Sequence, residues 1–161
     1  YIAFRFQSMF AGAAVVALIH DVIVVLGIFS IFGLDFDLTV LAALLAVIGY
    51  SLNDTIVVSD RIRENLRSET DENTTELINR SLNQTLGRTI ITSLTTLLVL
   101  FSLYLMGGEL IKNFALALIF GVIVGTYSSI YIASNALIMM GLTKDHLKVE
   151  DAENPDPYDL P

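Results

Sequence analysis

The 161-residue sequence contains no cysteine, only two histidines and few charged side chains for its length. Without cysteine, thiol chemistry and thiolate zinc sites are excluded, and the redox compartment cannot be inferred. His20 and His146 lie too far apart in the sequence to form a ligand pattern, and it contains no nucleotide-binding loop, nucleophile–base pair or metal cluster. We therefore expect no catalytic site, no metal and no cofactor, and nothing in the sequence indicates a nucleic-acid partner.

The scarcity of charge separates this chain from soluble domains. Charged residues make up 16% of it and hydrophobic residues 54%, whereas soluble domains carry about 25% charged residues. This composition indicates a membrane protein. About half of the net charge of −8 comes from the residues after Gly141, and we interpret 141–161 as an acidic, disordered, solvated tail rather than a docking patch.

Four apolar runs are long enough to cross a bilayer, which takes about 20 helical residues. Short connections around Gly33 and Gly107–Gly108 join the runs in two pairs, so the members of each pair should be antiparallel neighbours. The sequence thus predicts an all-α polytopic membrane protein built as a four-helix transmembrane bundle. The expected segments are transmembrane helices at 10–32, 38–59, 88–106 and 113–140, periplasmic loops at 33–37 and 107–112, a cytoplasmic linker at 60–87, and the end of a truncated helix at 1–9.

The polar linker between the second and third runs, 60–87, should first extend the second helix into water. Asn73 followed by Glu76 resembles a capping box and is expected to start an amphipathic helix. Aliphatic side chains then recur every four residues from Ile78 to Leu86. This helix could lie on the membrane surface or pack on its own bundle, and the pattern does not decide between the two.

Positive charge is strongly biased to one side of this topology. Of the nine Lys and Arg residues, only Lys112 falls on the side opposite the termini and the 60–87 linker. Because cytoplasmic loops are enriched in Lys and Arg, we expect both termini and the linker to be cytoplasmic. The sequence begins without methionine or a signal-peptide pattern, and we interpret it as a fragment of a longer membrane protein.

Asp54 lies inside the second apolar run, about 6 Å inward of Val58 along a helix. A charge in hydrocarbon costs at least about 2.5 kcal/mol, so this carboxyl group needs a partner, a wet cavity or a proton. Surroundings of low dielectric favour a neutral carboxyl group, and Asn53 adds a second polar group beside it. We interpret Asp54 as a group that binds and releases a proton; the alternative is a structural hydrogen bond between helices.

Arg88 begins the third run at the cytoplasmic depth from which the second run leaves. Thr92 and Thr96 follow at four-residue spacing, which places hydroxyl groups on one helix face and indicates a polar interior or a water-filled path. An arginine on this face could approach Asp54, stabilise its ionised form and release it after a movement. In the alternative interpretation, Arg88 is an anchor whose guanidinium group reaches the lipid headgroups.

His20 and Asp21 lie near the middle of the first run. They could form a second relay station for protons. They could also clamp two helices together, with a hydroxyl group from the third run or with the backbone. The clamp is the favoured interpretation, because no cation is expected at the depth of Asp21.

The fourth run carries small residues at strict four-residue spacing: Gly121, Gly125, Ser129 and Ala133. Small residues allow the backbones of membrane helices to approach closely. This spacing predicts a helix-packing seam rather than a transport site.

The sequence resembles the SecF family of protein-export membrane proteins in the stretches HDV, IGYSLNDTIVVSDRIREN, RTIITS and GTYSSIYIAS. The likeness extends from about Tyr1 to about His146. The resemblance implies a fold of the resistance-nodulation-division (RND) type, in which this bundle forms part of one of the two similar halves. It further implies that the family's intramembrane acid is Asp54 and that its proton-path arginine is Arg88. It also implies a multi-pass protein of the bacterial inner membrane that pairs with SecD, joins the SecYEG channel and contacts membrane lipid.

The resemblance implies that such a subunit uses the proton as coupling ion to promote export of unfolded polypeptides. Two other functions stay open. The chain could be a purely structural scaffold that holds SecD, or part of a proton-driven efflux pump for small molecules from the same superfamily. We expect no enzyme activity.

Overall fold

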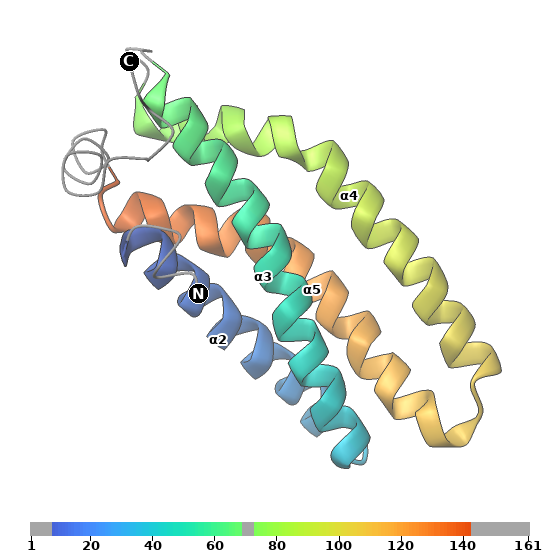
Figure 1. Cartoon of the computed structure of the whole chain (residues 1–161). Helices are drawn as coiled ribbons and strands as arrows, with labels where there is room; N and C mark the ends of the chain where they lie inside the picture. The colour runs from blue at the N-terminus through green and yellow to red at the C-terminus, as the bar shows by residue number, and fades with distance from the viewer. Residues whose placement is uncertain (1–7, 69–72, 143–161) are drawn as a thin grey trace, which may run out of the picture.

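Four long α-helices make up the structure, a computed structural model that describes residues 8–68 and 73–142. The helices are α2 (Ser8–Ile31), α3 (Leu38–Arg67), α4 (Thr74–Met106) and α5 (Glu109–Met139) (Figure 1). Each is long and apolar enough to cross a membrane, and these described residues form no strand. The predicted all-α polytopic fold is confirmed. The expected helix end before Ser8 and the acidic tail beyond Leu142 lie outside the described residues.

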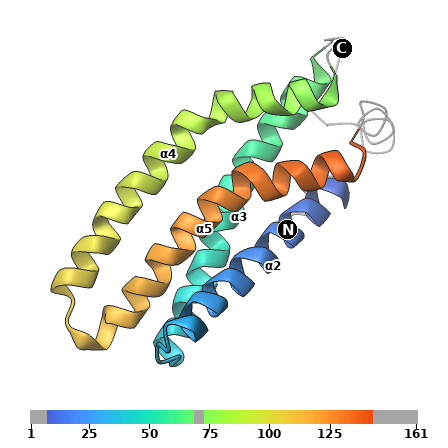
Figure 2. The ribbon, with the colours of Figure 1, turned by 180° about the vertical axis from the view of Figure 1, so that it is seen from behind.

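Helices α3 and α5 form the centre of the bundle. Each of them contacts the other three described helices, whereas α2 and α4 contact only α3 and α5 and lie on opposite sides of that pair. The α2–α3 and α4–α5 connections lie at the same end of the bundle (Figures 1 and 2). The two hairpins expected from the short connections are therefore present.

The α4–α5 connection is shorter than the predicted loop 107–112. Only Gly107 and Gly108 separate the two helices, and α5 begins at Glu109. Gly108 has a φ of 77°, in the left-handed region that favours glycine. This backbone conformation reverses the chain at once, so residues 109–112 belong to the helix.

On the other side of the bundle, the predicted linker 60–87 is almost entirely helical. Helix α3 continues to Arg67, and α4 begins at Thr74 and runs without a break into the third apolar run. Asn73 is the N-cap residue of α4, but its side chain makes no capping hydrogen bond, so the expected capping box with Glu76 does not form. The amphipathic segment is thus the first part of α4 rather than a separate helix.

This first part of α4 packs on its own bundle. Leu77 and Ile78 are fully buried and share an apolar cluster with Val58, Ile62 and other side chains. In the middle of α4, by contrast, many of the long apolar side chains are exposed. The sequence left open whether this segment lies on the membrane surface or packs on its own bundle, and the structure favours packing on the bundle.

Two apolar clusters enclose a polar middle. Along α3, the first cluster uses residues 40–44, and the second uses residues 58–66. Between them, the buried side chains of α3 include Ser51, Asp54 and Thr55. Because buried polar groups are costly without hydrogen bonds, these side chains need partners from neighbouring helices.

Asp37 caps the start of α3. One of its carboxylate oxygens accepts hydrogen bonds from the Thr39 hydroxyl and from the backbone amides of Thr39 and Val40. The Thr39 hydroxyl, followed by the Val40 amide, lowers the pKa of Asp37 below its ordinary value. The carboxylate satisfies backbone N–H groups that have no partner within the helix.

We predict that Asp37→Ala slightly lowers the thermal midpoint of the purified full-length protein, because the cap is lost. Since folding lowers the pKa of Asp37, the stabilisation is present above the unfolded-state pKa of about 3.9 and is lost as pH falls through the folded-state value. Thermal unfolding followed between neutral pH and pH 3 measures this. Asp37→Asn, which keeps an acceptor but does not titrate, should lose only this pH dependence; equal pH profiles for the Asp37→Asn variant and wild type would contradict the assignment.

Candidate functional site

The carboxyl group of Asp54 is buried in the polar middle of the bundle. Asp54 is 4% exposed, and its Oδ2 has no hydrogen-bond partner among the described residues. The same holds for Oγ1 of Thr89 on α4, a residue that is 1% exposed. Thr89 and Arg88 are the α4 residues that act electrostatically on the Asp54 carboxyl group. A buried acid thus faces α4 without a hydrogen bond that fixes its Oδ2.

Contacts on both sides of Asp54 fix the register of the antiparallel pair α3 and α4. On one side, Arg61 bonds to Gln84. On the other, the Tyr50 hydroxyl donates to Ser93 Oγ at 3.2 Å. Asp54 lies between these two levels on α3, as Thr89 does on α4, so the two residues occupy the same depth.

An open cavity of about 310 Å³ lies between α3 and α4 next to this depth. Its lining includes Val57 and Thr85, which lie one helical turn from Asp54 and Thr89, together with Arg88. Arg88 is exposed and makes no side-chain hydrogen bond or ion pair within the described part of the chain. The open cavity therefore approaches the buried acid to within about one helical turn along both helices.

A layer of three hydroxyl groups lies one turn beyond Asp54 in the other direction. Tyr50 donates to Ser93, and Ser93 Oγ lies 2.6 Å from Thr126 Oγ1. The Thr126 hydroxyl also donates to the carbonyl oxygen of Val122. This layer connects α3, α4 and α5, and its hydroxyl groups can both donate and accept hydrogen bonds.

The structure separates the polar residues that the sequence grouped with Asp54 and Arg88. Thr92 and Thr96 donate their hydroxyl hydrogens to the carbonyl oxygens of Arg88 and Thr92 in their own helix. Asn53 is exposed on α3. The α4 face toward Asp54 instead carries three buried residues, which are Thr85, Thr89 and Ser93. These three also follow four-residue spacing. The same spacing extends back through Ser81 to Leu77, an apolar residue at the start of α4, and this longer series is the sequence signal that could have identified the buried face.

Asp21 lies on α2, which among the described helices contacts α3 and α5 but not α4. It is fully buried; its Oδ2 accepts a hydrogen bond of 2.5 Å from Ser51 Oγ, and its Oδ1 lies 3.2 Å from Nδ1 of His20. Ser51 belongs to α3, so this contact joins α2 to α3. This is an interhelical clamp, as the sequence favoured, but its hydroxyl group comes from the second apolar run and not from the third run as expected. A proton relay through Asp21 stays a prediction.

The four small residues Gly121, Gly125, Ser129 and Ala133 all lie on the buried side of α5. A Cβ atom added at Gly121 would overlap the side chain of Val47 on α3, and one at Gly125 would lie 3.2 Å from Cβ of Ser51. The backbones of α3 and α5 therefore approach closely here, next to the level of Asp21 and Asp54.

Comparison with known proteins places this geometry in a family. Residues 1–143 match the family model described as "Protein export membrane protein SecD/SecF, C-terminal". The chain is 50% identical to the protein translocase subunit SecF of Vibrio alginolyticus over 153 residues, which cover 95% of this chain and 49% of that protein. It is 49% identical to the protein translocase subunit SecDF of Thermus thermophilus over 152 residues, which cover 94% of this chain and 20% of that protein.

A crystal structure of SecDF from Thermus thermophilus, named as a translocon-associated membrane protein, matches with a TM-score of 0.84 and 51% identity. The match covers 87% of this chain and 20% of that one. The chain spans about half the length of the SecF relatives it matches. By the family match over nearly all of its helices, this chain belongs to the SecD/SecF family of protein-export membrane proteins and corresponds to their C-terminal membrane part.

Proposed function

We propose that the full-length protein is an accessory subunit of the Sec protein-export machinery and that Asp54 couples proton movement to export. One observation carries the proposal: a buried carboxyl group, 4% exposed, lies between an open polar cavity on one side and a layer of hydroxyl groups on the other. The names of the relatives, which are translocase subunits, supply the process to which the proton would be coupled. The proton is the coupling ion, and no other cofactor is required.

The chemistry follows from the position of the acid. An ionised carboxylate in hydrocarbon is costly without a nearby cation, and a protonated carboxyl group costs much less. Movement of Arg88 toward or away from Asp54 would therefore favour one protonation state over the other, and proton binding would in turn favour one helix arrangement, because the coupling of two equilibria is reciprocal. The cavity gives the acid access to water from one side, and Tyr50, Ser93 and Thr126 provide a route toward the other.

The proposed partners are SecD, the SecYEG channel, the unfolded polypeptide in export and membrane lipid. The Thermus relative, whose name joins SecD and SecF in one chain, supports the SecD partner. The bias of Lys and Arg toward one side of the topology supports an inner-membrane protein with both ends of this chain in the cytoplasm. The proposed protein is a non-enzymatic transport subunit.

The test is whether a proton gradient increases export into vesicles that contain the full-length protein, and whether Arg88→Gln removes that increase. We predict that Arg88→Gln reduces the gradient-dependent part of export severalfold, because the movable cation near Asp54 is lost while the helix is kept. Arg67→Gln is the control, since it removes one exposed positive charge at the end of α3. Unchanged gradient-dependent export in Arg88→Gln would contradict the proposal.

The same experiment separates the two other functions. A scaffold predicts that Arg88→Gln lowers the amount of SecD that co-purifies with the protein and leaves export per assembled complex unchanged. A small-molecule pump predicts gradient-driven release of a small substrate without any effect on polypeptide export. Co-purification, export and small-molecule release are therefore measured on the same vesicles.

A further inference from the structure

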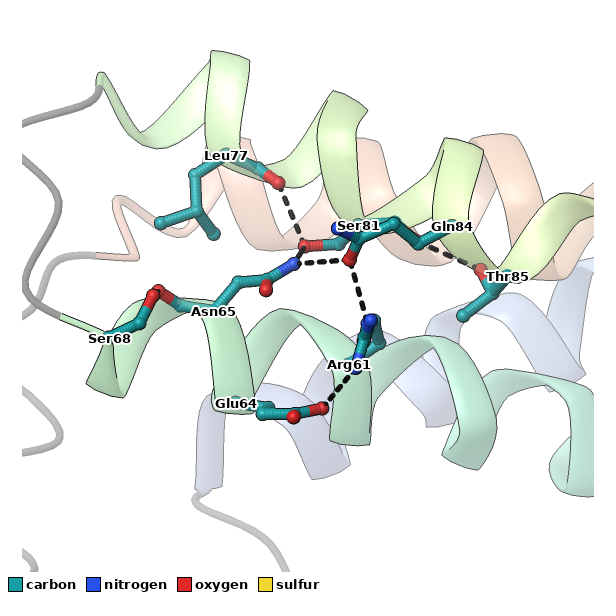
Figure 3. A network of polar contacts seen from close by, with 8 residues as sticks. All are labelled: Arg61, Glu64, Asn65, Ser68, Leu77, Ser81, Gln84 and Thr85. Atoms are coloured by element: carbon teal, nitrogen blue, oxygen red, sulfur yellow. Dashed lines mark hydrogen bonds and ion pairs between the residues drawn. The ribbon is translucent and has the colours of Figure 1, made fainter.

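A second polar network joins α3 to α4 (Figure 3). It lies at the end of the cavity away from Asp54, where Arg61 and Gln84 line it. Oε1 of Gln84 accepts two hydrogen bonds, one from Nε of Arg61 at 2.7 Å and one from Nδ2 of Asn65 at 2.9 Å. The same Asn65 nitrogen donates to Oγ of Ser81 at 2.7 Å. The two bonds to Gln84 occupy both lone pairs of its amide oxygen, so one atom of α4 is held by two residues of α3.

The network is fixed from both sides. On α3, Nη1 of Arg61 also bonds to Glu64 at 2.5 Å, which orients the guanidinium group toward Gln84. On α4, Ser81 donates its hydroxyl hydrogen to the carbonyl oxygen of Leu77 at 2.8 Å, which leaves its oxygen free to accept from Asn65. Ser81 is fully buried and Asn65 is 9% exposed, so the bond between these two is costly to break. Gln84 itself is exposed, and its bond with Arg61 lies at the surface.

Gln84 lies one helical turn before Arg88, and its neighbour Thr85 lies one turn before Thr89. Because α4 is continuous through these positions, a constraint at Gln84 is passed on to both residues through the helix itself. Gln84 and Arg61 also line the same cavity as Arg88. The network thus holds the two helices at one end of the cavity that leads to Asp54.

We propose that Gln84 is a positioning residue whose amide oxygen, through Arg61 and Asn65, sets the distance of Arg88 and Thr89 from Asp54. This role rests on the proposed function, since it concerns the geometry of the same proton site. Gln84 does not titrate and touches neither Asp54 nor a transported proton. It acts only through the placement of α4 against α3.

The substitution that tests the role is Gln84→Leu, compared with Gln84→Glu in the full-length protein in membranes. Leucine has a similar size but no acceptor, whereas glutamate keeps the oxygen that accepts from Arg61 and Asn65. Asn83→Leu is the matched control, because Asn83 is the adjacent exposed amide residue and its side chain makes no hydrogen bond to α3 among the described residues.

The first measurement is the distance between α3 and α4. At both Gly49 and Gly87 a Cβ atom would meet open space. In a full-length protein whose other cysteines, if any, are replaced, spin labels on Gly49→Cys and Gly87→Cys report on the two helices with little disturbance. We expect Gln84→Leu to widen the distribution of the distance between the labels, and Gln84→Glu and Asn83→Leu to leave it as in wild type.

The second measurement is gradient-dependent export. Gln84→Leu should reduce it roughly tenfold, and Gln84→Glu should restore it. If Gln84→Leu leaves the distance distribution unchanged, the positioning role is wrong, whatever its effect on export. If the distribution widens but gradient-dependent export stays at the wild-type level, the link to Asp54 is wrong.

Failure of the proposed function gives a different pattern. If wild-type export does not respond to a proton gradient at all, the proposed function fails and with it the link from Gln84 to a proton site. The effect of Gln84→Leu on the label distance is measured without a gradient, so it still reports whether the network holds α3 against α4.

Discussion

Asp54→Asn in the full-length protein is expected to reduce gradient-dependent export to the level seen without a gradient. Asparagine has nearly the shape of aspartate, so the packing of α3 against α4 should be kept. It cannot bind or release a proton near neutral pH, and it removes the carboxylate that the proposed movement of Arg88 would stabilise. The loss should therefore appear in coupling and not in the amount of protein in the membrane.

The direct measurement is an infrared titration of the intact complex. A carboxyl band that changes between its protonated and ionised forms over the working pH range should be present in wild type and absent in Asp54→Asn. Asp35→Asn is the control, because it makes the same chemical change in the exposed α2–α3 connection. An Asp54 carboxyl group that stays in one form under all conditions that support export would refute the coupling role and leave a structural one.

The second large effect is expected for stability at the contact between α3 and α5. Gly121→Ala should destabilise the bundle by about 1–3 kcal/mol, the usual cost of overpacking a tight interior. Alanine is intrinsically the better helix former by about 0.5–1 kcal/mol, but the added methyl group would meet Cβ and both methyl carbons of Val47. A β-branched side chain has little freedom to rotate away, so the cost of overpacking exceeds the gain in helix propensity.

A double-mutant cycle checks the cause. Val47→Ala alone should also destabilise the protein, because it leaves a gap next to Gly121, whereas Gly121→Ala with Val47→Ala should be more stable than the two single effects predict. The expected coupling is about 0.5–3 kcal/mol, measured by thermal unfolding of the full-length protein in one detergent. Gly27→Ala on α2 is the control, since a Cβ atom there meets nothing within 4 Å. Additive effects of Gly121→Ala and Val47→Ala on the free energy of unfolding would show that the added methyl group does not clash with Val47.

Membrane spans are the part of this protein that local sequence predicts well. Run length alone indicated four helices, because a bilayer requires about 20 apolar residues from each, and the short connections indicated their antiparallel pairing. Helix ends at the water boundary were predicted less well. No apolar requirement applies there. The local pattern did indicate a helix start at Asn73, which is the N-cap residue of α4, but not that this helix would run unbroken into the third span. The packing of Leu77 and Ile78 into the bundle is a long-range contact that local pattern does not contain.

By itself, the sequence determined that the chain forms four apolar helices with small residues in the fourth and an acid in the second, because hydrocarbon length and the cost of a buried charge act on each residue directly. Only the tertiary structure decided which hydroxyl groups face that acid. Arg88, Thr92 and Thr96 share the same four-residue spacing as Thr85, Thr89 and Ser93, and periodicity predicts the existence of a helix face but not its direction. The contact between Arg61 and Gln84 likewise depends on how α3 and α4 pack together, which no local stretch of the chain specifies.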